Sequence, residues 1–164
     1  MTTATTKERV QQTWSIDKIQ QEAVRVFSRN CMSTSALLEK IGGDALQQHQ
    51  EQMLKNKVEF FKSVGVKTPL ELIKAMAEFE TNVFGSKIVF WGDDKSASME
   101  YETCACFEQM QKDPNFKPEN MEKMGKMFAE HTEKLAKEFG FKGEMKMVGE
   151  KAQITFSKDG MCCG

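Results

Sequence analysis

Apolar residues recur at helical spacing along the first half of the chain. Over residues 5–30 one face of a predicted helix collects Ile16, Ile19, Val24 and Phe27. The polar segment SRNCMSTS (28–35) breaks this pattern, so we expect the helix to end there. A short helix over SALLEKIG, capped by Ser33 or Thr34, is predicted to follow and to stop at Gly42.

Two longer helices are predicted before residue 85. Asp44 can cap a helix that runs to about Val64. The segment TPLE then places Thr68 at an N-cap, with proline next and Glu71 three residues after the cap. The pattern predicts a helix from this point to about residue 83.

The second half alternates apolar and polar residues over two stretches, which predicts two β-hairpins at about 86–104 and 144–157. On the second strand of the first hairpin, Ala97, Met99 and Tyr101 are expected on one face. A short helix over CACFEQMQ and a long helix from Pro118 to Gly140 are predicted between the hairpins.

This order of elements predicts an α+β fold with an antiparallel sheet built from two hairpins and covered by several helices. We expect a single domain over 1–164, with residues 1–84 mostly helical, 85–157 forming hairpin, helix and hairpin, and 158–164 a cysteine-containing tail.

Composition narrows the classes of function. The chain has 164 residues and a formal net charge of −1, so a basic nucleic-acid-binding surface is disfavoured. No apolar run reaches the roughly 20 residues that a membrane span requires. The polar N-terminal segment lacks the apolar stretch of a signal peptide. We therefore expect a cytoplasmic protein that interacts neither with nucleic acid nor with membranes.

The five cysteines form an odd number and favour free thiols over a disulfide framework. Twelve methionines and twelve phenylalanines stand against one tyrosine. Such flexible apolar side chains fit either an ordinary soft core or an adaptable cavity for an apolar or soft ligand.

Two ionisable residues stand on apolar helical stripes. His131 lies in the middle of a stripe formed by Met121, Met124, Phe128, Leu135 and Phe139. It is either a neutral histidine hydrogen-bonded in the core or a ligand or general base facing a cavity. Glu80 shares a face with Ile73 and Ala77, and it either reaches water at the edge of the stripe or lines the same cavity.

Cys104 and Cys106 lie at a predicted strand-to-helix junction. Free helix amides there would lower a thiol pKa and favour a nucleophile or a metal ligand, although both thiols can equally be small core residues. A zinc or other soft metal ion would need further ligands. The candidate metal set is Cys104, Cys106, His131, Cys162 and Cys163, while His49 is expected to be half-buried.

The second half, from FGSKIVFWGDDKSASMEYETC through AEHTEKLAKEFGFKGEMKMVGEKAQITF, resembles the superfamily of 4-vinyl reductase-like small-molecule-binding domains and L-2-amino-thiazoline-4-carboxylic acid hydrolase-like proteins. The resemblance covers about half of the chain and implies that Cys104 matches the cysteine after the first hairpin. The chain has His131 and Gln153 where the family pattern has cysteines, so the resemblance bears on the fold more than on hydrolase activity.

Three functions follow as hypotheses. The leading one is a module that binds a small molecule or a soft metal ion between sheet and helices, with a Cys/His polar end. The second is a cysteine-dependent hydrolase of a small amide or thioester-like substrate, with Cys104 as nucleophile, His131 as base and Glu80 as orienting group. The third is a structural subunit-interaction protein, and the apolar composition allows a homodimer.

Overall fold

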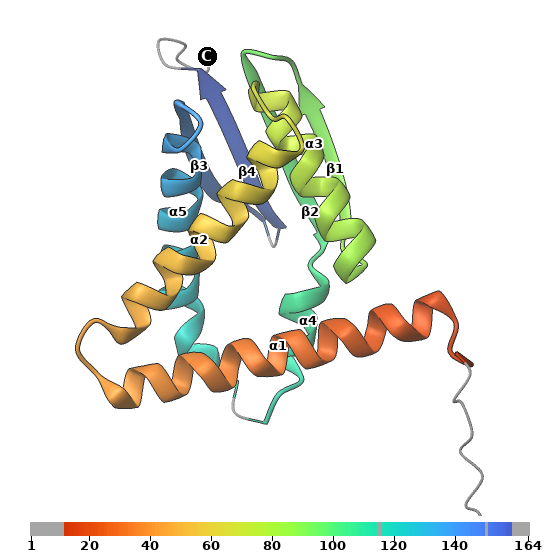
Figure 1. The fold of residues 1–164 in the computed structure, drawn as a ribbon, viewed down its shortest axis with the longest axis vertical. Helices are drawn as coiled ribbons and strands as arrows, with labels where there is room; N and C mark the ends of the chain where they lie inside the picture. Colours follow the sequence, from red (N-terminus) through yellow and green to blue (C-terminus); the bar gives the residue numbers. More distant parts are fainter. Residues whose placement is uncertain (1–11, 115, 150, 159–164) are drawn as a thin grey trace, which may run out of the picture.

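A computed structural model describes residues 12–114, 116–149 and 151–158 of the chain. Five α-helices and four strands follow one another in the order predicted for an α+β fold (Figure 1). The helices are α1 (Ile16–Ile41), α2 (Ala45–Ser63), α3 (Pro69–Phe79), α4 (Ala105–Gln111) and α5 (Met121–Lys137). The π-helix η1 (Glu80–Phe84) continues α3, and the short 3₁₀-helix η2 (Pro118–Asn120) precedes α5. The strands are β1 (Lys87–Gly92), β2 (Ser96–Thr103), β3 (Phe141–Val148) and β4 (Lys151–Lys158).

The two predicted hairpins are confirmed, and together they form one antiparallel sheet of order β1-β2-β4-β3. The hairpins meet along β2 and β4, where Ala97 pairs with Phe156 and Met99 with Ile154. These four side chains are buried on the inner face, as the alternating pattern predicts. The outer face carries polar residues, among them Ser98 and Thr155, whose hydroxyls lie 2.8 Å apart.

The core lies between the inner face of the sheet and three helices. Helix α3 packs on β1, β2 and β4, while α5 packs on β3. Buried residues of α2, α3 and α5 complete the core, chiefly Val58, Phe61, Leu72, Ile73 and Leu135. The start of α3 follows the predicted capping box, because Thr68 Oγ1 accepts from Glu71 N and the Glu71 carboxylate accepts from Thr68 N.

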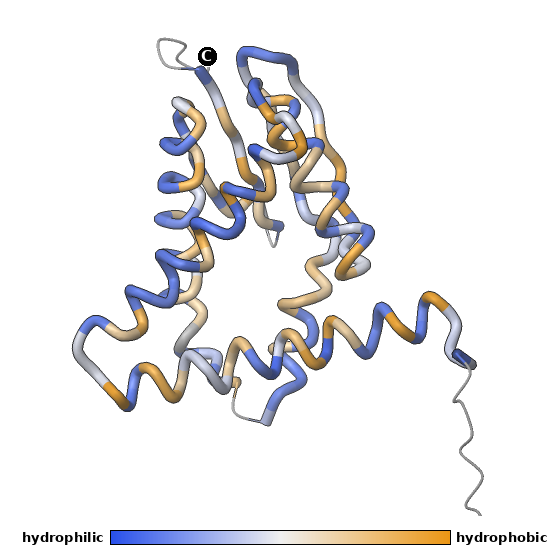
Figure 2. The backbone as a smooth tube through the Cα atoms, viewed as in Figure 1, coloured by the Kyte–Doolittle hydropathy of each residue, from blue (hydrophilic) through white to orange (hydrophobic). Residues whose placement is uncertain are grey.

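Helix α1 lies across the far end of the molecule and projects beyond it at its N-terminus (Figure 1). It packs on α4, α2 and η1. Apolar residues recur along its whole length, including the projecting part (Figure 2). No helix in the described part of the chain combines the length and apolar character of a membrane-spanning segment.

Three predicted details are wrong. The segment 28–35 does not break α1, because it contains neither Gly nor Pro and its Ser28 is buried against α4, where Ser28 Oγ donates to Cys106 O. Helix α3 turns into a π-helix at Glu80 instead of continuing as an α-helix. Finally, the stripe on α5 is buried only toward its C-terminal end, since Phe128 is 53% exposed whereas Leu135 is 1% exposed.

Candidate functional site

Six ionisable side chains meet on the α1 side of the core. They come from five elements and act on one another electrostatically, and each is half-buried. We refer to them as the inner cluster: Lys57 of α2, Glu80 of η1, Tyr101 of β2, Cys104 and Cys106 around the start of α4, and His131 of α5. The sequence pattern had singled out four of the six.

The cysteines sit where β2 ends and α4 begins. Cys104 has extended backbone angles and is the N-cap of α4. The backbone N–H groups of Phe107 and Cys106 act on the Cys104 thiol and lower its pKa, as the free helix amides had suggested. Desolvation is the larger effect, however, and it raises the pKa of Cys104 above its ordinary value.

Cys106 is even less disposed to ionise. Its pKa is raised to about 12, chiefly by desolvation and then by the nearby carboxylate of Glu80. The pKa shifts of both cysteines therefore run opposite to the lowering that the helix amides alone would give. Burial outweighs the helix amides because the thiols lie inside the fold rather than at its surface. At neutral pH both thiols are protonated and can act as weak hydrogen-bond donors.

The π-helix places Glu80 in the cluster. A π-turn inserts one extra residue, which changes the direction of the side chains that follow α3. Ser86 Oγ donates to Glu80 Oε2 at 3.4 Å and accepts from the backbone N–H of Ala105 at 3.2 Å. This buried serine thereby links Glu80 to the first turn of α4. Desolvation raises the pKa of Glu80, while Lys57 and Ser86 partly offset the increase.

Lys57 is the cation of the cluster and was missed by the sequence reasoning. Desolvation lowers its pKa, and the opposing influence of Glu80 and Cys106 does not cancel this effect. No ion pair or hydrogen bond joins Lys57 Nζ to another described residue. The signal was present in the sequence, because Lys57 stands on the same helical stripe as Leu54 and Phe61, just as Glu80 and His131 stand on theirs.

His131 of α5 lies within electrostatic reach of Lys57 of α2. Desolvation lowers the pKa of His131 to about 4, with further contributions from Lys57 and Lys134. The imidazole is therefore neutral at physiological pH. Within the described ranges no hydrogen bond joins His131 to Cys104 or Glu80, so the three groups of the proposed hydrolase are near one another without forming a nucleophile–base–carboxylate chain.

Tyr101 of β2 is the residue that the sheet contributes to the inner cluster. Its pKa is raised well above the ordinary value by desolvation, and then by Glu80 and the two thiols. The phenol remains protonated and can donate a hydrogen bond. Tyr101 was predicted on the inner face of β2, but its place beside Glu80 could not be deduced from the hairpin alone.

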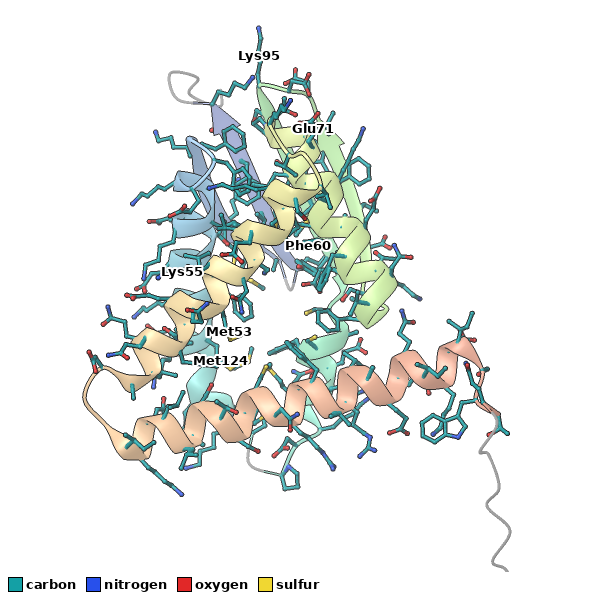
Figure 3. The ribbon with its side chains drawn as sticks, viewed as in Figure 1. Met53, Lys55, Phe60, Glu71, Lys95 and Met124 are labelled. Atoms are coloured by element: carbon teal, nitrogen blue, oxygen red, sulfur yellow. The ribbon has the colours of Figure 1, made fainter. Side chains whose placement is uncertain are left out.

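An apolar wall lies next to the cluster. The phenylalanine rings of α1, η1, α3 and α2 form a continuous row, in which neighbouring centroids are 4.9 Å apart for Phe27 and Phe84, 5.6 Å for Phe84 and Phe79, and 5.4 Å for Phe79 and Phe60. In the view of Figure 3, Met53 and Met124 lie between the core and α1.

No three His, Cys, Asp or Glu side chains in the described ranges lie close enough together to hold a metal ion. Cys162 and Cys163, two members of the candidate metal set, lie outside the described residues. His49 is half-buried on α2, as expected.

Comparison with protein-family models and with curated proteins found no match to this chain. The chemistry of the inner cluster and of the apolar wall beside it is therefore what points to a function.

Proposed function

We propose that the protein binds a small, largely apolar molecule with an acidic end, and that this end pairs with Lys57 in the inner cluster. The observation that carries the proposal is an interior ammonium group without a hydrogen-bond partner in the described chain. A desolvated cation is costly unless it is paired. A carboxylate supplied by a ligand would provide the missing partner.

The neighbours of Lys57 suit an acidic group. Tyr101 and both thiols stay protonated at neutral pH and can donate to its oxygens. Glu80 would compete for Lys57 when ionised, but its raised pKa lets it take up a proton as the ligand arrives. The negative charge of the ligand then replaces that of Glu80, so the net charge of the inner cluster does not change.

The apolar part of the ligand would lie along the phenylalanine row and the nearby methionines. Phe27 and Phe60 are 39% and 42% exposed, so the row is not covered by other parts of the described chain. Thioether side chains adapt to ligands of different shape. Polar groups at one end of an apolar surface are the usual composition of a small-molecule site.

A small molecule is favoured over a soft metal ion because the described cysteines and His131 do not form a three-ligand group. It is favoured over hydrolysis by Cys104 because both thiols resist ionisation and His131 makes no hydrogen bond to them.

Calorimetric titration with decanoate, decanol and decylammonium tests the proposal, because these probes share a tail and differ in the end group. We expect decanoate to bind most tightly. Lys57→Met should weaken decanoate binding about tenfold or more, the equivalent of one charge-assisted hydrogen bond, and leave decanol binding nearly unchanged.

Lys55→Met is the matched control, since Lys55 is exposed on the same helix two residues earlier. It should bind all three probes as the unmodified protein does. The proposal is overturned if none of the probes binds, or if Lys57→Met and Lys55→Met have the same affinity for decanoate.

A further inference from the structure

An exposed stripe of residues runs along α1, beside the face that packs on the molecule. Its members recur alternately three and four residues apart: Ile16, Ile19, Ala23, Val26, Asn30, Ser33 and Leu37, which we call the α1 stripe. All seven are exposed, and Ile16 and Leu37 are 81% and 58% exposed. Figure 2 shows apolar residues recurring along this helix, including its projecting end.

Other positions of α1 account for its contacts with the rest of the chain. Val24 and Ser28 are buried, and Gln20 Nε2 donates to the carbonyl oxygens of Thr81 and Asn82. At 100° per residue the buried positions Val24 and Ser28 lie at least 120° away from both Val26 and Asn30. The α1 stripe is therefore not needed to hold α1 in place.

The spacing of the α1 stripe predicts that its partner is another helix. Residues that alternate three and four apart repeat every 3.5 residues on average, and this repeat forms the seam between two helices packed side by side. The 26 residues of α1 span about 39 Å, so the partner must offer a helix of comparable length. A second copy of this chain offers such a helix with the same stripe exposed.

We propose that two copies of the chain associate through their α1 stripes, with the two α1 helices parallel. Asn30 determines the direction. It occupies the same class of position as Ile16, Ala23 and Leu37, seven residues apart, and besides Ser33 it is the polar member of the stripe. In an in-register parallel pair each Asn30 meets Asn30 of the other copy, where the two amides satisfy each other, whereas an antiparallel pair that overlaps along the whole of α1 places Asn30 level with residue 27.

Charge and area are both compatible with self-association. The stripe has no charged residue, and Glu22 beside it accepts hydrogen bonds from Lys18 and Arg25 of its own helix, which limits repulsion between copies. The exposed fractions of the large apolar side chains of the stripe and of the adjoining Ile41 correspond to roughly 500 Å² per copy. A pair would bury about 1,000 Å², which is near the lower limit for a specific interface.

Sedimentation velocity of the full chain over roughly a hundred-fold concentration range tests the association. We expect a dimer that dissociates on dilution. Val26→Glu and Ile19→Glu should both be monomeric with an unchanged circular dichroism spectrum, because each places a charge in the seam. Gln21→Glu adds the same charge at an exposed position outside the stripe and should remain dimeric.

Oxidation of a Val26→Cys variant tests the direction, because an in-register parallel pair places Val26 against Val26 of the other copy, whereas an antiparallel pair that overlaps along the whole of α1 places it level with residue 31. This variant should form a disulfide-linked dimer beyond the level given by the unmodified chain, and Gln21→Cys should not. A monomeric unmodified protein, a dimer unaffected by both glutamate variants, or a dimeric Val26→Cys variant without the extra disulfide would each overturn the proposal.

Discussion

The neutral imidazole of His131 inside the fold makes the free energy of unfolding depend on pH in the acidic range. The pKa of His131 is lowered from 6.5 to about 4, so the unfolded chain binds a proton more readily than the folded chain between these values. Unfolding therefore becomes easier as pH falls from about 6.5 to about 4. The loss should reach at most about 3 kcal/mol, because each pKa unit corresponds to about 1.36 kcal/mol.

Urea unfolding from pH 7 to pH 4 measures this loss. His131→Gln should flatten the acid side of the stability curve, whereas His49→Gln, which removes the other histidine, should keep it. The raised pKa of Glu80 makes the folded protein more stable as pH falls over part of this range. This contribution is the same in the variants and in the unmodified protein, so it cancels in the comparison. Identical acid slopes for His131→Gln and the unmodified protein would contradict the assignment.

The thiols of Cys104 and Cys106 are predicted to react slowly. Their pKa values are raised by desolvation, and alkylation proceeds through the thiolate. With iodoacetamide at pH 8, followed by peptide mapping, both cysteines should be labelled more slowly in the folded protein than in the same protein in urea. Faster labelling of either one in the folded protein would mean that its amide contacts outweigh burial.

For single residues, the sequence predicted the kind of side chain found in the inner cluster better than it predicted every member of the cluster. A polar residue on an apolar stripe identified Glu80 and His131 and would have identified Lys57. Ser86 could not be found in this way, because a serine between a helix and a strand is common and its two hydrogen bonds depend on tertiary structure. The thiol pKa could not be predicted because desolvation depends on the surrounding elements.

The π-helix depends on a side chain from a distant helix. Gln20 Nε2 of α1 donates to the carbonyl oxygens of Thr81 at 3.1 Å and Asn82 at 2.8 Å. A π-turn changes the regular pairing of helical carbonyls, and remote donors can satisfy them. Gln20→Ala should therefore lower the free energy of unfolding by about 1–2 kcal/mol.

Gln21→Ala is the control for this experiment, since Gln21 is the same residue type at the next position of α1 and is exposed. It should change the free energy of unfolding by less than about 0.5 kcal/mol. Equal effects of the two substitutions in urea unfolding would show that the contact with η1 contributes nothing.

The elements themselves were largely predictable where a local pattern specifies them. The capping box at Thr68 and the alternation in both hairpins depend on neighbouring residues, and the structure confirms them. The continuity of α1 through 28–35 and the π-turn at Glu80 depend on contacts with α4 and α1, which a local pattern does not contain.

The placement of α5 on the sheet depends on one glycine. A Cβ atom at Gly143 of β3 would lie 2.6 Å from Thr132 O and 2.7 Å from Ala136 Cβ of α5. Gly143→Ala must push α5 away from β3, and we expect a loss of about 1–3 kcal/mol in the free energy of unfolding. Because α5 carries His131, the variant should also weaken decanoate binding.

Gly125→Ala provides a control of opposite sign on the same helix. Nothing lies within 4 Å of a Cβ atom there, and alanine is favoured over glycine inside a helix. This variant should be more stable by about 0.5–1 kcal/mol, as measured by urea unfolding. If Gly143→Ala were also neutral or stabilising, the close packing of α5 on β3 would be refuted.

The sheet order has a consequence for synthesis on the ribosome. Strand β4 is the last of the four to be made, yet it lies inside the sheet between β2 and β3. Until residue 158 has emerged, the first hairpin presents Ala97 and Met99 without a neighbour on that edge. Pairings between segments distant in sequence form slowly and leave apolar surface open meanwhile. We therefore expect the nascent chain to be most prone to aggregation before its final strand inserts.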